Sequence, residues 1–178
     1  MRLPLAILLL GFATATASGQ NPWRELVFGQ SRDGVRSQLE NANLAVESTP
    51  DGNLQSNADY PLPLPGLANP IPVMATFLFD TSAHLTEVTL SVDLPALRRD
   101  YPSLGSDEAL YNFAADKLGL ALAGQYGNPV FSSIACSAAP QTAPCTLQWR
   151  SQVLVVQLES TSAGHHVRVH YLPVPTTL

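Results

Sequence analysis

Residues 71–94 read IPVMATFLFDTSAHLTEVTLSVDL, and this stretch decides the fold. Every second residue of its first part is apolar, namely Val73, Ala75, Phe77 and Phe79. Its second part, residues 87–93, alternates polar and apolar side chains without a break. Such alternation is typical of antiparallel strands with one buried face and one solvated face. With the short connection at residues 80–83, the stretch predicts a β-hairpin.

Two helices are predicted on either side of this hairpin. Ser31 can cap a short helix in which Val35, Leu39 and Ala42 recur at helical spacing. Ser106 can cap a longer helix whose acidic first turn suits the positive end of the helix dipole. The run Tyr-Gly-Asn-Pro at residues 126–129 is expected to end it. The longer helix presents one apolar stripe, formed by Leu110, Phe113, Ala114, Leu118, Ala121 and Leu122.

Further strands and turns are predicted around these elements. The segment 60–65, Tyr-Pro-Leu-Pro-Leu-Pro, lacks the N–H donors of a central strand, which indicates an edge or polyproline-like segment. The residue chemistry at 50–53 is typical of a turn. A connection is expected after Pro95, at residues 98–100. Strands are expected at residues 44–49, 130–136, 146–150, 153–158 and 166–172.

This order predicts an α+β fold with an antiparallel sheet and helices packed on one face. A helix followed by strands occurs twice, which indicates two possible α-β-β-β units in tandem, residues 23–94 and 106–172. A cystatin-like arrangement, with the sheet curling around the main helix, is the alternative.

The N-terminus predicts export. Arg2 precedes a short apolar run, residues 3–13, and an A-x-A pattern of small residues follows. These features define a secretory signal peptide, residues 1–17, with cleavage near Ala17. We therefore expect a single periplasmic or extracellular domain, residues 18–178. No cysteine lies at the cleavage site and no later segment is long enough to span a bilayer, so neither a lipid anchor nor a membrane span is expected.

The two cysteines, Cys136 and Cys145, are predicted to form a disulfide, because an isolated pair in an exported chain is usually oxidised. The bond would close a small loop between two strands and contribute roughly 2–3 kcal/mol. Two reduced, buried cysteines are the alternative. The net charge of −5 disfavours general binding to nucleic acid or to anionic lipid.

Three short motifs resemble small exported envelope proteins of the β-lactamase-inhibitor-protein-like (BLIP-like) fold, which include outer-membrane assembly lipoproteins. The motifs are Phe28-Gly29-Gln30-Ser31-x-x-Gly34-Val35-x-x-x-Leu39, Phe77-x-Phe79 with Leu85-x-x-Val88, and Leu122-x-x-x-Tyr126-Gly127-x-Pro129. The chain departs from these lipoproteins in lacking the anchor cysteine, and it has Gly34 where a charged residue is usual. The resemblance implies protein–protein interaction rather than catalysis.

The sequence contains no hydrolase elbow, P-loop, zinc-protease or EF-hand motif, so we expect no catalytic residues, metal or cofactor. Histidines cluster at His165, His166 and His170. On a strand, His166 and His170 share a face but lie roughly 13 Å apart, too far to ligate one metal ion together. A hydrolase-type site assembled across strands, using these histidines, remains an alternative.

The leading hypothesis is a non-enzymatic interaction or envelope accessory protein whose partner is another exported or envelope protein. The second is a carrier of a small hydrophobic ligand, with a pocket lined by Phe77, Phe79, Val88 and Leu90. Five aromatic residues could form a patch for a partner, although core packing suits most of them better. They are Trp23, Tyr101, Tyr111, Tyr126 and Trp149.

Overall fold

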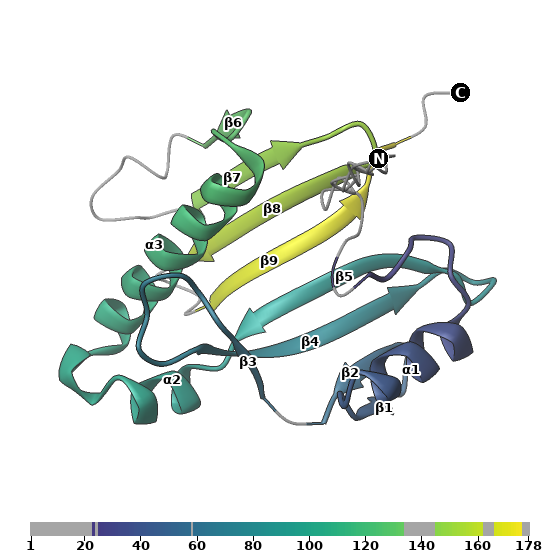
Figure 1. Cartoon of the computed structure of the whole chain (residues 1–178), viewed down its shortest axis with the longest axis horizontal. Coiled ribbons are helices and arrows are strands. Elements are labelled where there is room, and N and C mark those ends of the chain that lie inside the picture. The colour runs from purple at the N-terminus through teal and green to yellow at the C-terminus, as the bar shows by residue number, and fades with distance from the viewer. Residues whose placement is uncertain (1–22, 24, 58, 134–144, 162–165, 176–178) are drawn as a thin grey trace, which may run out of the picture.

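The computed structural model describes residues 23, 25–57, 59–133, 145–161 and 166–175. Within these residues the chain forms three α-helices and one nine-stranded antiparallel sheet, which confirms the predicted α+β class (Figure 1). None of the helices in this part of the chain is long and apolar enough to cross a membrane. The helices are α1 (Arg32–Asn41), α2 (Leu94–Asp100) and α3 (Asp107–Tyr126), with a 3-10 turn at Pro102–Leu104. The strands are β1 (Val46–Ser48), β2 (Leu54–Ser56), β3 (Tyr60–Leu62), β4 (Ile71–Phe79), β5 (Leu85–Val92), β6 (Phe131–Ser132), β7 (Cys145–Arg150), β8 (Leu154–Thr161) and β9 (His166–Pro173).

The strand order is β1-β2-β4-β5-β9-β8-β7-β6, and β3 also pairs with β4. Read outward from the central β5–β9 pair, strands β9 to β6 form a meander, whereas on the other side both β2 and β3 pair with β4. We call α1 with β1–β5 the first half, and α3 with β6–β9 the second half. Two tandem units joined through their last strands would give this order. The duplication and its boundaries, 23–94 and 106–172, stay a prediction.

The predicted hairpin is confirmed as β4 and β5. Phe77 of β4 lies opposite Val88, and Val88 lies opposite Tyr171 of β9, so one row crosses three strands. At the turn, Asp80 Oδ1 accepts hydrogen bonds from the backbone N–H groups of Ser82 and His84, at 2.8 and 2.9 Å. These bonds to the charged carboxylate lower the pKa of Asp80. The turn is thus fixed by its own sequence.

Both predicted helix caps are confirmed. Ser31 Oγ accepts from the N–H of Gly34 at 3.3 Å, and Ser106 Oγ accepts from the N–H of Ala109 at 3.1 Å. Gly127 ends α3 with a φ of 82°, a left-handed conformation that glycine adopts readily. The indole of the buried Trp149 donates to the carbonyl of Gly127 at 2.8 Å, which ties the end of α3 to β7.

Helix α2 was expected only as a connection. Asp93 Oδ1 caps it by accepting from the N–H of Ala96 at 2.7 Å, and Pro95 occupies its first turn, where proline fits. The buried Ala96 and Leu97 hold this helix against the core. Seven residues with two buried positions are too few to show a helical period, so the cap and the proline were the usable signals.

The first half has an interrupted edge. Both β2 and β3 pair with β4, but these pairs stop at Thr76 and Val73, which leaves a gap in the ladder at Met74 and Ala75. The N–H of Ala75, which faces this gap, donates instead to the buried Ser56 Oγ at 3.0 Å. Strand β2 was not predicted, whereas the edge character of residues 60–65 is confirmed by β3.

The second half follows the predicted strands closely. Strand β7 was expected at residues 146–150, β8 at 153–158 and β9 at 166–172, and each lies within three residues of those bounds. Of the strand expected at 130–136, the described part holds only β6, paired with β7. Helix α3 packs across β7, β8 and β9. A Cβ at its Gly119 would lie 3.5 Å from the side chain of Leu158, an ordinary van der Waals contact.

Candidate functional site

A cavity of about 740 Å³ lies between α3, the proline-rich loop after β3 and the central strands β5 and β9. We call it the loop–helix cavity. Figure 1 shows that the loop runs from β3 toward α3, so both halves contribute walls to the cavity. The volume falls within the roughly 300–1,000 Å³ of small-molecule sites. Its apolar walls include Leu62, Leu64 and Leu67 of the loop, Leu118 and Leu122 of α3, and Leu90 and Val169 of the sheet.

The alternation of leucine and proline shapes the loop wall. Leu62 and Leu64 are partly buried and pack against the core, whereas Pro61, Pro63 and Pro65 are exposed. An extended chain places alternate residues on opposite sides, so the leucines pack against the core together, and Pro63 and Pro65 also line the cavity. The prolines fix φ and lack N–H donors, which keeps this segment extended without further strand pairing.

The far end of the loop is tied to α2. The side-chain amide of Asn69 donates to the carbonyl of Asp100 at 3.1 Å. In the other direction, the hydroxyl of Tyr101 donates to the carbonyl of Asn69. Burial raises the pKa of Tyr101, and the neighbouring charge of Asp100 raises it further, so this phenol stays protonated and can donate. The cavity wall is therefore anchored at both ends, by β3 and by α2.

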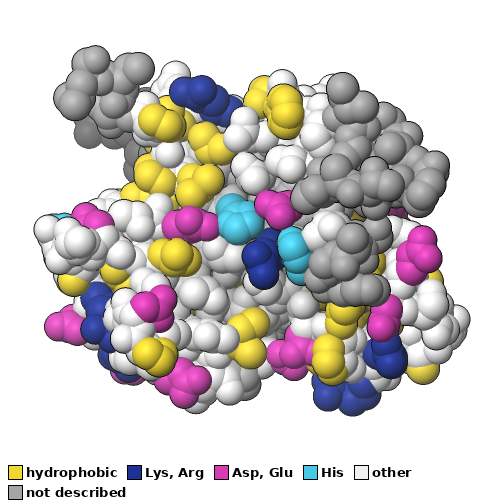
Figure 2. Space-filling view, turned by 180° about the vertical axis from the view of Figure 1, so that it is seen from behind, with side chains coloured by type: hydrophobic (Ala, Val, Ile, Leu, Met, Phe, Trp, Pro, Cys, Tyr) yellow, Lys and Arg dark blue, Asp and Glu magenta, His cyan; other side chains and the backbone are white. Residues whose placement is uncertain are grey.

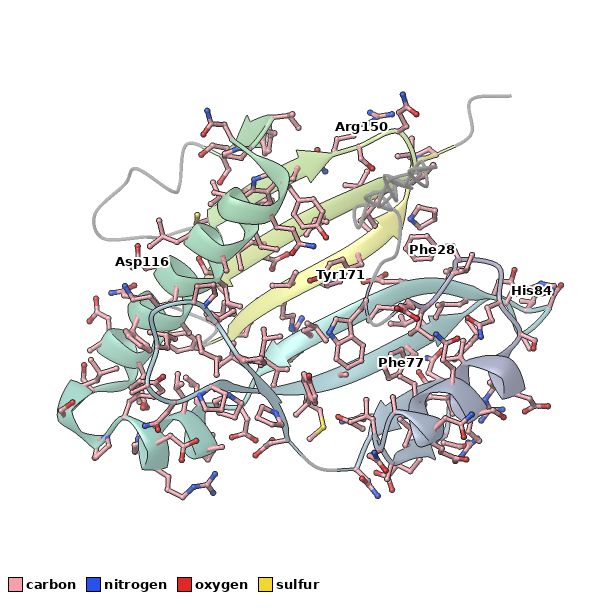
Figure 3. The ribbon with its side chains drawn as sticks, viewed as in Figure 1. Phe28, Phe77, His84, Asp116, Arg150 and Tyr171 are labelled. Carbon is pink, nitrogen blue, oxygen red and sulfur yellow. The ribbon has the colours of Figure 1, made fainter. Side chains whose placement is uncertain are left out.

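The polar groups of the cavity are few. Tyr171 rises from the centre of the sheet (Figure 3), and burial together with the nearby Tyr126 raises its pKa well above the usual range. It is therefore a neutral phenol at all physiological pH values. Gln125 and Lys117 of α3 also line the cavity. Leu120 lines it while remaining 61% exposed, so an apolar side chain stands where the cavity meets solvent.

The predicted pocket lining was only partly right. Leu90 lines the loop–helix cavity, as expected. Phe77 and Val88 are fully buried in the core, and the ring of Phe77 packs against Trp23 with centroids 5.7 Å apart. Phe79 is partly buried against the same core. The prediction for Phe77 and Val88 was wrong because alternation identifies a buried face without saying whether a neighbour fills the space above it.

Of the predicted histidine cluster, the structure describes His166 and His170, and each lies beside its own carboxylate. His170 Nδ1 is 2.7 Å from Glu87 Oε1, which also accepts from Thr89 Oγ1 at 2.8 Å. His166 Nε2 is 3.1 Å from Glu159 Oε1. Figure 2 shows histidine, basic and acidic side chains gathered on the face seen from behind. Within the described ranges no group of three metal-ligating side chains occurs. His165 lies outside them.

The five aromatic residues considered for a partner patch are buried or partly buried in the core. Trp23 contacts the ring of Tyr60 edge to face at 5.3 Å, and Tyr101 packs on Phe113 at 4.7 Å. Tyr111 and Trp149 are buried, with 3% and 2% of their surface exposed. Burial also raises the pKa of the partly buried Tyr126.

Of the two cysteines predicted to form a disulfide, the structure describes only Cys145. Cys145 begins β7, opposite Ser160 of β8, whereas Cys136 lies outside the described residues. The bond stays a prediction.

No protein-family model, curated protein or solved structure matches this chain. The resemblance to BLIP-like envelope proteins and the cystatin-like alternative therefore stay predictions. The candidate site rests on the geometry of the loop–helix cavity.

Proposed function

We propose that the protein is an exported binding protein that holds a small apolar ligand in the loop–helix cavity. The observation that carries this proposal is a cavity of about 740 Å³ with leucines on three sides. Sites for small molecules are mostly apolar, concave and supplied with a few polar groups that fix orientation. Tyr171, Gln125 and Lys117 are such groups here.

The hydrophobic effect would supply most of the affinity. Each CH₂ group moved from water into the cavity is worth up to about 0.8 kcal/mol, roughly a fourfold change in affinity. Part of the wall is already in place without a ligand, because Leu62, Leu64 and Leu67 pack against the core. A preformed wall lowers the ordering cost of binding.

Protein–protein interaction, the leading hypothesis from the sequence, receives less support from the geometry. That hypothesis calls for a contiguous apolar or aromatic patch on the sheet. The seam between β5 and β9 instead presents Glu87, Thr89 and His170 in one hydrogen-bonded group. We therefore place small-ligand binding first. The same group bridges the two halves, a structural role that needs no catalytic function.

The proposal includes export of the chain by its N-terminal leader, residues 1–17, and a disulfide between Cys136 and Cys145. Both can be tested by mass spectrometry of the protein recovered from the exported fraction. Cleavage near Ala17 and a mass two units below that of the reduced chain are expected.

Binding is tested by calorimetry with a series of straight-chain alcohols from eight to twelve carbons. We expect affinity to rise with each added carbon. Ala121 lines the cavity, so Ala121→Phe should fill it and weaken binding at least tenfold. Asn112→Phe adds the same ring at an exposed position of α3 and serves as the control. Circular dichroism checks that both variants fold. Equal binding by both variants, or no binding by the unmodified protein, contradicts the proposal.

A further inference from the structure

The charge distribution of the loop–helix cavity points to one class of ligand, an inference that rests on the proposed function. Among the described residues that line the cavity, Lys117 alone carries a charge. It is also the only lysine in the sequence. A ligand held by these walls therefore meets one positive group and otherwise apolar or neutral polar surface.

Lys117 is placed to bind the polar end of an elongated ligand. Lys117, Ala121 and Gln125 follow one another at intervals of four residues, so they lie along one side of α3. At 1.5 Å per residue, Lys117 and Gln125 stand about 12 Å apart along the helix axis. The apolar surface of Ala121 lies between them. This arrangement suits an elongated ligand with its polar end at one limit of the cavity.

The ammonium group of Lys117 remains partly solvated. Its side chain is 34% exposed, and its Nζ lies 3.1 Å from Asp116 Oδ2 and 5.8 Å from the centroid of the Phe113 ring. Asp116 is 60% exposed and is not a wall of the cavity. Exposed ion pairs of this kind are weak, so the ammonium can turn to a second anion at little cost.

We propose that the ligand is a single-chain amphiphile with an anionic carboxylate head. The carboxylate pairs with Lys117 at the rim, and the alkyl chain runs along Ala121 beneath the leucines of the loop. The head stays near solvent, so the charge is not buried without a partner. A cationic head of the same chain length would meet the Lys117 charge and be rejected.

The inference is tested by measuring Kd for decanoate, decanol and decyltrimethylammonium at pH 8 and low ionic strength. The protein is expressed with all 178 residues of the sequence. We expect decanoate to bind about three- to tenfold more tightly than decanol, and the cationic amphiphile to bind most weakly. This preference should shrink as salt is added, because the pair is partly exposed.

Two variants sharpen the test. Lys117→Gln should remove the preference for decanoate over decanol. Asp116→Asn removes the competing carboxylate and keeps the lysine, so it should retain or increase the preference. If decanol binds but decanoate is not preferred, or if Lys117→Gln retains the preference, the inference is overturned while the proposed function stands. If none of the three amphiphiles binds, both are overturned.

Discussion

Each half of the sheet has a helix followed by strands, but the halves differ in the lengths of these elements. Helix α1 has 10 residues, whereas α3 has 20. Strands β1 and β2 of the first half have three residues each, whereas β7 and β8 have six and eight. The first half has instead the proline-rich loop, which reaches across to α3. The loop–helix cavity therefore lies where the halves differ, between the long helix α3 of the second half and the proline-rich loop of the first half.

The largest effect is expected at the interrupted edge of the first half. Ser56→Ala would leave the N–H of Ala75 buried without its acceptor, which should cost about 1–3 kcal/mol of unfolding free energy. Ser132→Ala, at an exposed position of the edge strand β6 in the second half, should stay within about 0.5 kcal/mol of the unmodified protein. Urea denaturation measures both. Similar losses in the two variants would remove the distinction between the edges.

A smaller effect on stability is expected at alkaline pH, from Tyr171 of β9 in the second half. In the unfolded chain Tyr171 ionises near pH 10, whereas burial keeps it protonated in the folded protein at higher pH. Above pH 10 the folded state thus holds more protons, and stability should fall by about 1.4 kcal/mol per pH unit. Tyr171→Phe, which keeps the ring, should flatten this slope in denaturation series from pH 9 to 11. An unchanged slope contradicts this assignment.

The smallest effect compares one glycine from each helix. Gly124 of α3 has no atom within 4 Å of a built Cβ, so Gly124→Ala should stabilise the protein by up to about 1 kcal/mol through helix propensity. In α1, a Cβ at Gly34 would lie 3.1 Å from Ser31 Oγ and 3.3 Å from Gln30 Nε2. Gly34→Ala should therefore gain less. Thermal unfolding without ligand compares the two variants. An equal gain would show that Ser31 and Gln30 make room for the new Cβ at no cost in stability.

Local patterns predicted those parts of the fold that local chemistry determines. The alternation at residues 71–94 and the caps at Ser31 and Ser106 depend on neighbours in sequence, and the structure confirms them. Strand β2 was missed because three residues show no period, and its Ser56 acts through Ala75, which is remote in sequence.

The candidate site was predicted less well, because a cavity forms only where no other residues cover an apolar face, and the pattern of one segment does not show this. Leu90 was assigned correctly to a cavity wall, yet Phe77 lies on the same face and is covered by Trp23. The usable signal was the leucine–proline alternation of residues 60–65. It indicates a segment with one apolar side that cannot form a central strand, so beyond its edge pairing in β3 its apolar side has to cover another surface.

The position of β9 has a consequence for the order of folding. This strand comes after all the others in the sequence, yet it pairs with β5 at the middle of the sheet, so that His170 meets Glu87 across 83 residues of chain. A chain made from its N-terminus can form the β4–β5 hairpin early, but β5 keeps an unpaired edge until residues 166–173 emerge. Contacts this distant in sequence slow folding. Such a protein takes longer to fold than one built from neighbouring contacts, which would suit the proposed export.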